Sequence, residues 1–463
     1  MKTWIFGLLS VMVLTIGYAQ TDSEGDYSSD EIYELEAFEI TGGFAGSLAA
    51  ATEVKKIQPV IVEAIAAEDI GKLPDTSIAE SLARLPGLTT QRINSRAQGI
   101  VIRGLVGDFS TAMLNGRQQV STSGDRSVEF DQYPAELLNG VTVYKTSTAS
   151  LVGQGLAGTI NMQTIRPLAL DDKLFAANVF YQMVDAGKLN PDSDDTGMRF
   201  SVNYADQFMD DKLGIAFGFS SVDQAGQGEQ FNAWGYPETG NGEFVIGGIK
   251  PFVRSSNLER TSYMSVVEYR PNRSFHATLD MFYSDFAETQ ILRGLEVPFQ
   301  WSSAQLQPGY TVEDGLVTRG VFNNVYMVMR NDNVWRDADI YNVGLNLRFG
   351  DEDGWVFEVD LSNSAMERKD NVLETYSGFA SNQNGIADSV AFEMTGIGIQ
   401  LTPTLDYTDA NNITLTSPQG WGGNRVPGGQ VGFFKGPVAN DDLRQYKAIT
   451  YNELDHSFFK KIE

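Results

Sequence analysis

The strongest constraint on this chain is an alternation of apolar and polar residues that returns in one run after another from Phe175 onward. In residues 341–349, every second residue is aliphatic or aromatic, and those between are Asn, Gly or Arg. A period of two indicates a β-strand with one apolar face. Each run is about ten residues long, the length that a tilted strand needs to cross a membrane. The other runs are 175–184, 198–205, 213–222, 261–270, 275–285 and 355–363, with 443–453 as a weaker candidate.

The connections between these runs alternate between short and long. Short connections are 207–212, 271–274 and 350–354, and long ones are 223–260 and 286–339. Outer-membrane barrels combine short periplasmic turns with long extracellular loops, whereas soluble sandwiches usually have short links at both ends. The pattern therefore predicts part of an antiparallel transmembrane β-barrel in residues 168–463, with apolar side chains facing lipid and polar ones facing the lumen.

The N-terminus has the features of a secretory signal peptide. Lys2 precedes an apolar run at 4–17, and the small residues Gly17 and Ala19 suit cleavage after Ala19. This run is too short to span a bilayer comfortably, and no later segment supplies about twenty consecutive apolar residues. We therefore expect a signal peptide at 1–19, and any membrane insertion should use β-strands.

The composition excludes several kinds of site. The chain has no cysteine and only two histidines, His276 and His456, which excludes disulfides, cysteine catalysis and a His-rich zinc site. Asp192, Asp194 and Asp195 lack the ligand spacing and the glycine of an EF-hand loop. The formal net charge of -26 repels phosphate backbones, so we expect no nucleic-acid partner. We expect no metal and no cofactor.

Residues 59–167 have the pattern of a small α+β domain. Ser77 and Glu80 have capping-box spacing at the start of a short helix, and Pro86-Gly87 would end it. Asn115-Gly116 favours a two-residue hairpin, because both residues tolerate a positive φ. These signals place a helix and paired strands in one compact unit.

The second half of this domain is predicted to contain another short helix, from Pro134 to the pair Asn139-Gly140, and then a strand at 141–145. Gly153 to Gly158 matches the pattern GxGxxG. A dinucleotide site also needs a helix directly after that pattern, but residues 159–164 have the composition of a strand. We therefore expect no nucleotide site.

The order of sequence blocks in this domain resembles the plug of TonB-dependent outer-membrane receptors. The blocks are VIVEAIAAEDIGKLPDTSIAESLARLPG, GIVIRGL, AMLNGRQQ, ELLNGVTVYKT and GLAGTINMQTIRP. The resemblance implies a non-enzymatic uptake receptor in the bacterial outer membrane, with a plug inside a barrel of about 22 strands. Fewer alternating runs are present and the chain ends in HSFFKKIE, so we expect an N-terminal fragment with an incomplete barrel.

Residues 20–58 are predicted to be a flexible segment that carries a TonB-box-like motif. An alternating stretch precedes Gly42-Gly43, and a segment of this kind can add as a strand to the edge of a partner's sheet. By the resemblance, the partner is TonB with its inner-membrane energising complex, while outer-membrane lipid surrounds the strands. The motif residues are Leu35, Glu36, Ala37, Phe38, Glu39, Ile40 and Thr41.

The plug blocks most resemble the branch of the family associated with oligosaccharide uptake. Trp234, Tyr236 and Trp301 lie near Asn and Gln residues in the long connections, and aromatic faces with amides suit sugar rings. The alternative is that these aromatic residues only pack the loops. Two other classes stay open: a siderophore or vitamin-type receptor of the same family, and a secreted β-rich glycan-binding protein or glycosidase.

By the resemblance, ligand also meets two loops of the plug, at 105–110 and 120–126. The candidate ligand-binding residues there are Asp108, Phe109, Ser121 and Asp125. The alternative role for these loops is contact with the barrel wall.

Overall fold

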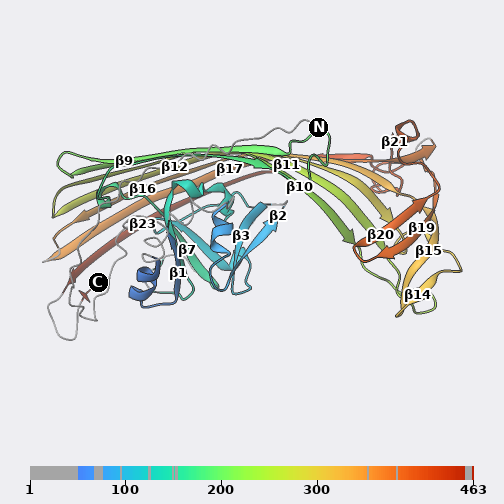
Figure 1. Ribbon diagram of the computed structural model, residues 1–463, viewed down its shortest axis with the longest axis horizontal. Coiled ribbons are helices and arrows are strands. Elements are labelled where there is room, and N and C mark those ends of the chain that lie inside the picture. Colours follow the sequence, from blue (N-terminus) through green and yellow to red (C-terminus); the bar gives the residue numbers. More distant parts are fainter. Residues whose placement is uncertain are drawn as a thin grey trace, which may run out of the picture.

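The structure is a computed structural model that describes residues 51–66, 77–93, 96–123, 127–148, 151, 155–351, 354–381, 384–453 and 461–462. The predicted signal peptide and the TonB-box-like residues 35–41 lie outside the described residues. An N-terminal domain lies beneath a long curved sheet, which we call the large sheet (Figure 1). No described helix is long and apolar enough to cross a membrane.

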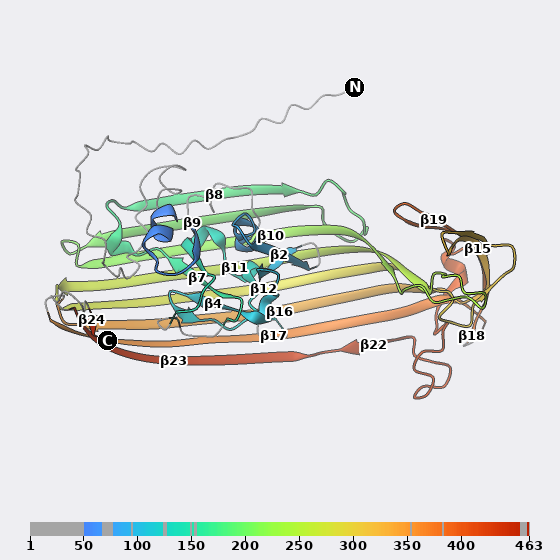
Figure 2. The same ribbon diagram turned by 90° about the horizontal axis from the view of Figure 1, so that it is seen from below.

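The large sheet is built from strands that pair antiparallel with their neighbours in chain order. Its main strands are β8 (Leu174–Met183), β9 (Thr196–Phe208), β10 (Leu213–Ala233), β11 (Gly248–Asn272), β12 (Phe275–Pro298), β16 (Val328–Phe349), β17 (Trp355–Ser381) and β23 (Val438–Glu453). All the predicted runs lie in these strands, including 443–453. Within the described residues the sheet is open, with β8 at one edge and β24 (Lys461–Ile462) beside β23 at the other (Figure 2).

Five strands of the large sheet, β10, β11, β12, β16 and β17, are much longer than predicted, with 21 to 27 residues each. Much of 223–260 and 286–339, predicted to be loops, is therefore strand. The actual long connections there are 234–247 and 299–327. The prediction was wrong because alternation identifies a strand only where one face is apolar, whereas β10 continues as a ladder through 223–233, where most residues on both faces are polar or glycine.

The outer face of the large sheet carries two rows of aromatic side chains with an apolar band between them. One row is a ladder of Phe219, Tyr263, Tyr283 and Tyr341, with ring centroids 4.9 to 6.3 Å apart. The other row contains Tyr269, Phe275 and Phe349. Between Phe275 and Tyr283, β12 rises about 26 Å along the strand. Aromatic girdles flanking an apolar band mark the two interfaces of the bilayer.

The N-terminal domain contains a five-stranded sheet in the order β1 (Val62–Ala66), β6 (Leu138–Tyr144), β7 (Gly158–Thr164), β4 (Ser110–Leu114) and β5 (Arg117–Gln118). A hairpin of β2 (Leu88–Ile93) and β3 (Arg96–Ile102) and the helix α3 (Ile78–Leu82) pack against it. Single 3-10 turns join these elements: η1 (Gly107–Phe109), η2 (Phe130–Gln132), η3 (Ala135–Leu137) and η4 (Pro167–Ala169).

The predicted hairpin at Asn115-Gly116 is present, with φ values of 53° and 76°. The capping box is wrong. Ser77 Oγ donates to the carbonyl oxygen of Ala97 (3.0 Å), and Glu80 pairs with Arg92 (2.6 Å). Both side chains bind the β2–β3 hairpin because it packs beside the start of the helix.

The predicted second helix is wrong as well. Only the single turn η3 forms after Pro134, and Asn139 and Gly140 lie inside β6, where Gly140 pairs with β7 and Asn139 lies at a shift in the register. Pairing in the sheet outweighs the turn preference of Asn-Gly at this place. Residues 159–164 lie in β7, so the GxGxxG segment precedes a strand, as predicted.

Three connections at one end of the large sheet fold together into what we call the loop unit: residues 234–247, 299–327 and 388–403. A small sheet joins β13 (Gln305–Leu306), β14 (Thr311–Glu313), β15 (Leu316–Val325), β19 (Asp388–Thr395) and β20 (Gly398–Pro403). Its core includes the stacked rings of Phe299, Phe322 and Phe392, with centroids 4.8 to 5.9 Å apart. The unit hangs on the side of the large sheet that carries the N-terminal domain (Figure 1).

The remaining short elements pair with or follow β17. They are β18 (Asn384–Gly385), η5 (Ala410–Asn412), β21 (Ile413–Leu415) and β22 (Gly432–Lys435).

Candidate functional site

The contact between the N-terminal domain and the large sheet is the candidate functional site. Its centre is apolar. Tyr133 stacks on Phe282 of β12 at a centroid distance of 5.2 Å, and Met264, Ile340 and Met366 of neighbouring strands join the core of the domain. The sequence predicted a polar inner face, and that prediction is wrong at this level because here the face covers a folded domain instead of water.

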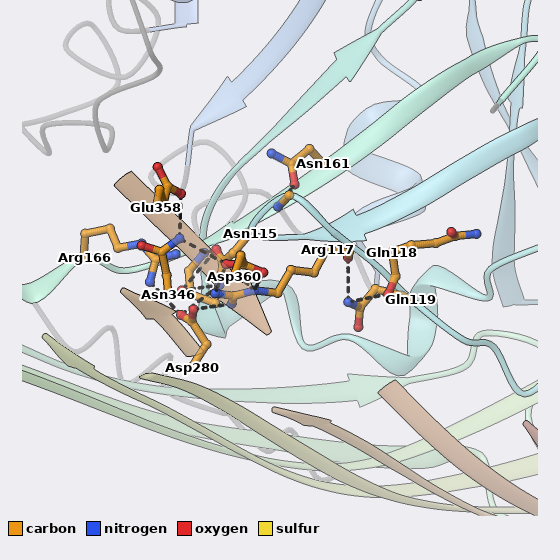
Figure 3. A network of polar contacts seen from close by, with 12 residues as sticks. Asn115, Arg117, Gln118, Gln119, Asn161, Arg166, Asp280, Asn346, Glu358 and Asp360 are labelled. Carbon is orange, nitrogen blue, oxygen red and sulfur yellow. Dashed lines mark hydrogen bonds and ion pairs between the residues drawn. The ribbon is translucent and has the colours of Figure 1, made fainter. Parts of the chain in front are cut away.

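The lower cluster lies on the side of this apolar centre nearer the short turns. Arg117 Nη1 donates to Asp280 Oδ2 of β12 (2.5 Å), and its Nε and Nη2 donate to the two carboxylate oxygens of Asp360 of β17 (2.9 and 2.7 Å). Arg166 Nη1 and Asn115 Nδ2 bind the other oxygen of Asp280 (2.6 and 3.0 Å). One arginine of the domain thus joins two strands of the large sheet (Figure 3).

Gly344 makes room for this arrangement. It lies in β16, between the strands that carry the two carboxylates, and pairs directly with Asp280. A Cβ at Gly344 would lie 2.2 Å from Arg117 Nη1 and 2.4 Å from its Cζ. Burial would lower the pKa of Arg117, but Asp360 and Asp280 raise it overall, so the guanidinium stays charged.

The local fold holds Arg117 in position. The tight turn at Asn115-Gly116 is tied to β7, since Gly116 N donates to Asn161 Oδ1 (2.9 Å) and Thr164 N donates to Asn115 Oδ1 (2.9 Å). On the opposite side, Asn346 Nδ2 donates to Asp360 Oδ2 (3.2 Å). Both ends of the main ion pair are therefore fixed by further hydrogen bonds (Figure 3).

The upper cluster lies on the other side of the apolar centre, nearer the loop unit. Arg96 of the domain donates to Asp131 Oδ2 (2.6 Å) and to Glu288 Oε2 of β12 (2.8 Å). Arg260 of β11 donates to the carbonyl oxygen of Asp131. Arg336 of β16 extends the cluster by pairing with Asp370 (3.0 Å). All these groups except Arg336 are at least nine-tenths buried.

Asp131 is the buried carboxylate on the N-terminal domain's side of the upper cluster. Burial raises its pKa to about 6, although Arg96 acts in the opposite direction. Asp131 therefore takes up a proton at a higher pH than an ordinary aspartate does, and that proton would weaken its pair with Arg96.

A third ionic group lies at the N-terminal edge of the domain. Glu63 of β1 accepts from Lys145 Nζ (3.0 Å) and from Lys55 Nζ (2.7 Å), and Lys145 also donates to the carbonyl oxygen of Pro86. Burial alone would raise the pKa of Glu63, but the two lysines lower it overall. This group ties the first residues of the domain to the edge strand β1.

The predicted aromatic residues of the long connections lie near the start of β11. The ring of Trp234 covers Gly248, and Trp301 covers the neighbouring Gly247 and also Gly235. Tyr236 and Trp301 are exposed, while Trp234 is half-buried beside Lys250.

The predicted residues of the domain loops also differ from one another. Asp108 and Phe109 are exposed in η1. Ser121 is buried, and its hydroxyl accepts from the amides of Ser123 and Glu129, which closes a turn. Asp125 lies outside the described residues. A role for these residues in ligand binding stays a prediction.

The sequence analysis missed Arg117, Arg96 and their partners. A usable signal was present at Arg117, since an arginine directly after a tight Asn-Gly turn is held rigidly. Asp280 and Asp360 were also visible as charged residues on the polar side of predicted strands. Their pairing was not predictable, because it depends on which strands lie opposite the hairpin.

The first part of the chain matches a family model. The model is described as TonB-dependent Receptor Plug Domain, and it matches residues 54–160. Residues 54–160 are a plug domain. The predicted fold class, a small α+β plug followed by antiparallel barrel-type strands, is confirmed, and so is the outer membrane as the location. No curated protein sequence matches this chain.

Several solved structures are similar to this chain at low sequence identity. The ferric enterobactin receptor PfeA of Pseudomonas aeruginosa is 12% identical with a TM-score of 0.39, over 76% of this chain and 60% of that one. The copper transporter OprC is 13% identical with a TM-score of 0.35, over 85% and 60%. The siderophore receptor PirA of Acinetobacter baumannii is 10% identical with a TM-score of 0.31, over 76% and 75%. The chain thus spans about 60% of the length of the first two.

Proposed function

We propose that this chain acts in TonB-dependent uptake of a ligand across the outer membrane. The observation that supports the proposal is the way in which the plug domain is attached to the large sheet. The domain is held on the inner face of the large sheet by two ion clusters on either side of a small apolar centre. A domain held in this way can be released in steps without unfolding the large sheet.

The energy for release would come from TonB through residues 35–41. An added strand is held by main-chain hydrogen bonds, so Phe38→Pro, which removes a donor and fixes φ, should disrupt pairing more than Phe38→Ala. In the full-length protein we expect Phe38→Pro to abolish uptake and leave surface binding of ligand nearly unchanged. Equal uptake by wild type and Phe38→Pro would remove this segment from the mechanism.

We propose an oligosaccharide as the ligand. The support is chemical: exposed Tyr236 and Trp301, and half-buried Trp234, present aromatic faces at the end of the large sheet where the loop unit lies. Stacking combined with amide hydrogen bonds needs no charge on the ligand. The acidic balance of the chain also disfavours strongly anionic chelates.

Calorimetry with glycan oligomers and with ferric chelates tests this ligand class. Trp234→Ala and Trp301→Ala should each weaken sugar binding by about 0.5 to 1.5 kcal/mol if the ring stacks on sugar. An effect of only one substitution would identify which of the two indoles the ligand meets. Tight binding of a ferric chelate with no glycan binding would reject the sugar and favour a siderophore-type ligand.

A further inference from the structure

A chain of hydrogen bonds leads from the plug domain along the inner face of the large sheet toward the loop unit. Glu288 uses one carboxylate oxygen to accept from Arg96 of the plug domain (2.8 Å) and the other to accept from Gln290 Nε2 (2.8 Å). Gln290 Oε1 accepts from Arg254 Nη1 (2.9 Å). An unbroken series of polar contacts therefore joins Arg254 to Arg96 and Asp131. Arg254 lies on the part of the inner face of the large sheet beyond the plug domain, which we call the wall.

The burial of these residues changes from one end of the series to the other. Asp131, Arg96, Glu288 and Gln290 are all buried, with 1 to 7% exposed surface, whereas Arg254 is half-buried. Interactions between buried groups are weakly screened, so a shift at one member is felt by the next. Arg254 is therefore the place in the series where a bound molecule has access.

We propose that Gln290 is a positioning residue that couples the wall at Arg254 to the upper cluster of the plug domain. Its amide accepts from an arginine at one end and donates to a carboxylate at the other. Neither Glu nor Lys can do both, since Glu has no donor when ionised and Lys has no acceptor. The position thus requires a neutral amide, which can accept from Arg254 and donate to Glu288 at the same time.

Through this coupling, a molecule bound at the wall would change the hydrogen bonds of the upper cluster. A ligand hydroxyl or carbonyl that binds Arg254 competes with Gln290, and a released Gln290 leaves Glu288 with one partner fewer on the side away from Arg96. This purpose rests on the proposed function. The coupling itself is measurable without ligand and without TonB, so its failure and a failure of the uptake proposal are distinguishable.

A double-mutant cycle tests the coupling on the full chain in detergent micelles. The readout is amide hydrogen exchange in the β2–β3 hairpin, which carries Arg96. We expect Arg254→Ala to accelerate this exchange by about twofold or more when Gln290 is present, as for residues that share one polar network. In a Gln290→Leu background, Arg254→Ala should have no further effect.

Two more variants separate coupling from simple damage. Gln290→Glu keeps an acceptor for Arg254 and nearly the same volume but loses the donor to Glu288, so it should uncouple the two ends as Leu does. Gln445→Leu is the matched control, because Gln445 accepts from the amide of Gln118 (3.2 Å) and lies outside the series. There the effect of Arg254→Ala should persist. Unchanged exchange in β6 and β7 would show that each variant is folded.

Two results would overturn the proposal. One is an effect of Arg254→Ala that is the same size with and without Gln290. The other is an absence of any effect when Gln290 is present. Gln290→Glu carries the test if Gln290→Leu does not fold.

Discussion

The guanidinium of Arg117 occupies the space that a side chain at Gly344 would need, with Nη1 2.2 Å from the place of its Cβ. This contact is between a plug-domain hairpin and the backbone of a large-sheet strand. The carboxylates of Asp280 and Asp360 stand on the strands to either side. The fit of charge and the fit of shape are therefore separate properties of one contact, and separate substitutions can test them.

Gly344→Ala tests shape while leaving every charge in place. The added methyl group must displace the Arg117 guanidinium, and overpacking of this kind costs about 1 to 3 kcal/mol. We expect the plug domain to become sensitive to protease at a lower urea concentration, while circular dichroism of the large sheet is unchanged. Gly240→Ala is the control, because no atom lies within 4 Å of its Cβ position. Equal urea profiles for the two variants would contradict the steric role.

Arg117 substitutions test charge. Arg117→Met leaves the half-buried Asp360 without its cation and the buried Asp280 with Arg166 as its remaining cation. Breaking a buried ion pair from one side costs about 3 to 5 kcal/mol. Arg117→Lys keeps the charge but cannot form the paired bonds to Asp360, so an intermediate loss is expected. The same urea and protease assay measures both. If Arg117→Lys had the same urea and protease profile as the wild type, the paired bonds to Asp360 would not contribute to the attachment of the plug domain.

Glu63 predicts a pH dependence at the N-terminal edge of the plug domain. Its pKa is lowered below 4.5 in the folded state, so the folded state binds its proton less tightly than the unfolded state does. The stabilisation is present above that pH and is lost as the pH falls through the lowered pKa. Amide exchange of residues 51–66 should accelerate in that acidic range in the wild type. Glu63→Gln should show less of this pH dependence, and identical curves would exclude Glu63 as its source.

The position of Phe322 in the shared core predicts that the three connections of the loop unit unfold together. The ring is fully buried between Phe299 and Phe392, which come from different connections. Phe322→Ala should cost about 3 to 5 kcal/mol within that core. We expect faster amide exchange in all three connections, although only one is altered. The exposed neighbour Val321→Ala is the control. A change confined to 299–327 would show that the connections are independent.

The fold was largely predictable because its main elements obey strong local rules. The alternation at 341–349 and the Asn115-Gly116 turn each depend on nearest neighbours, and both are confirmed. The extent of β10 and β11 was not predictable. Their outer halves pair across the ladder without a regular apolar face, so the sequence there has no periodic signal.

The site was less predictable than the fold for a physical reason. Asp280 and Asp360 lie on strands that are not neighbours in the sheet, and Arg117 reaches both only because β16 between them carries a glycine. Such a contact depends on three strands and a separate domain. Ser77 shows the same limit on a smaller scale, since its hydroxyl prefers the carbonyl of Ala97 to its own helix.

The aromatic ladder through Tyr283 also fixes the height of the loop unit above the membrane. From Tyr283 to Pro298, β12 continues for about 50 Å along the strand. Even after allowance for a strand tilt of about 45°, that leaves roughly 35 Å of wall above the lipid. The loop unit therefore stands well clear of the lipid headgroups, at a height comparable to the thickness of the bilayer itself.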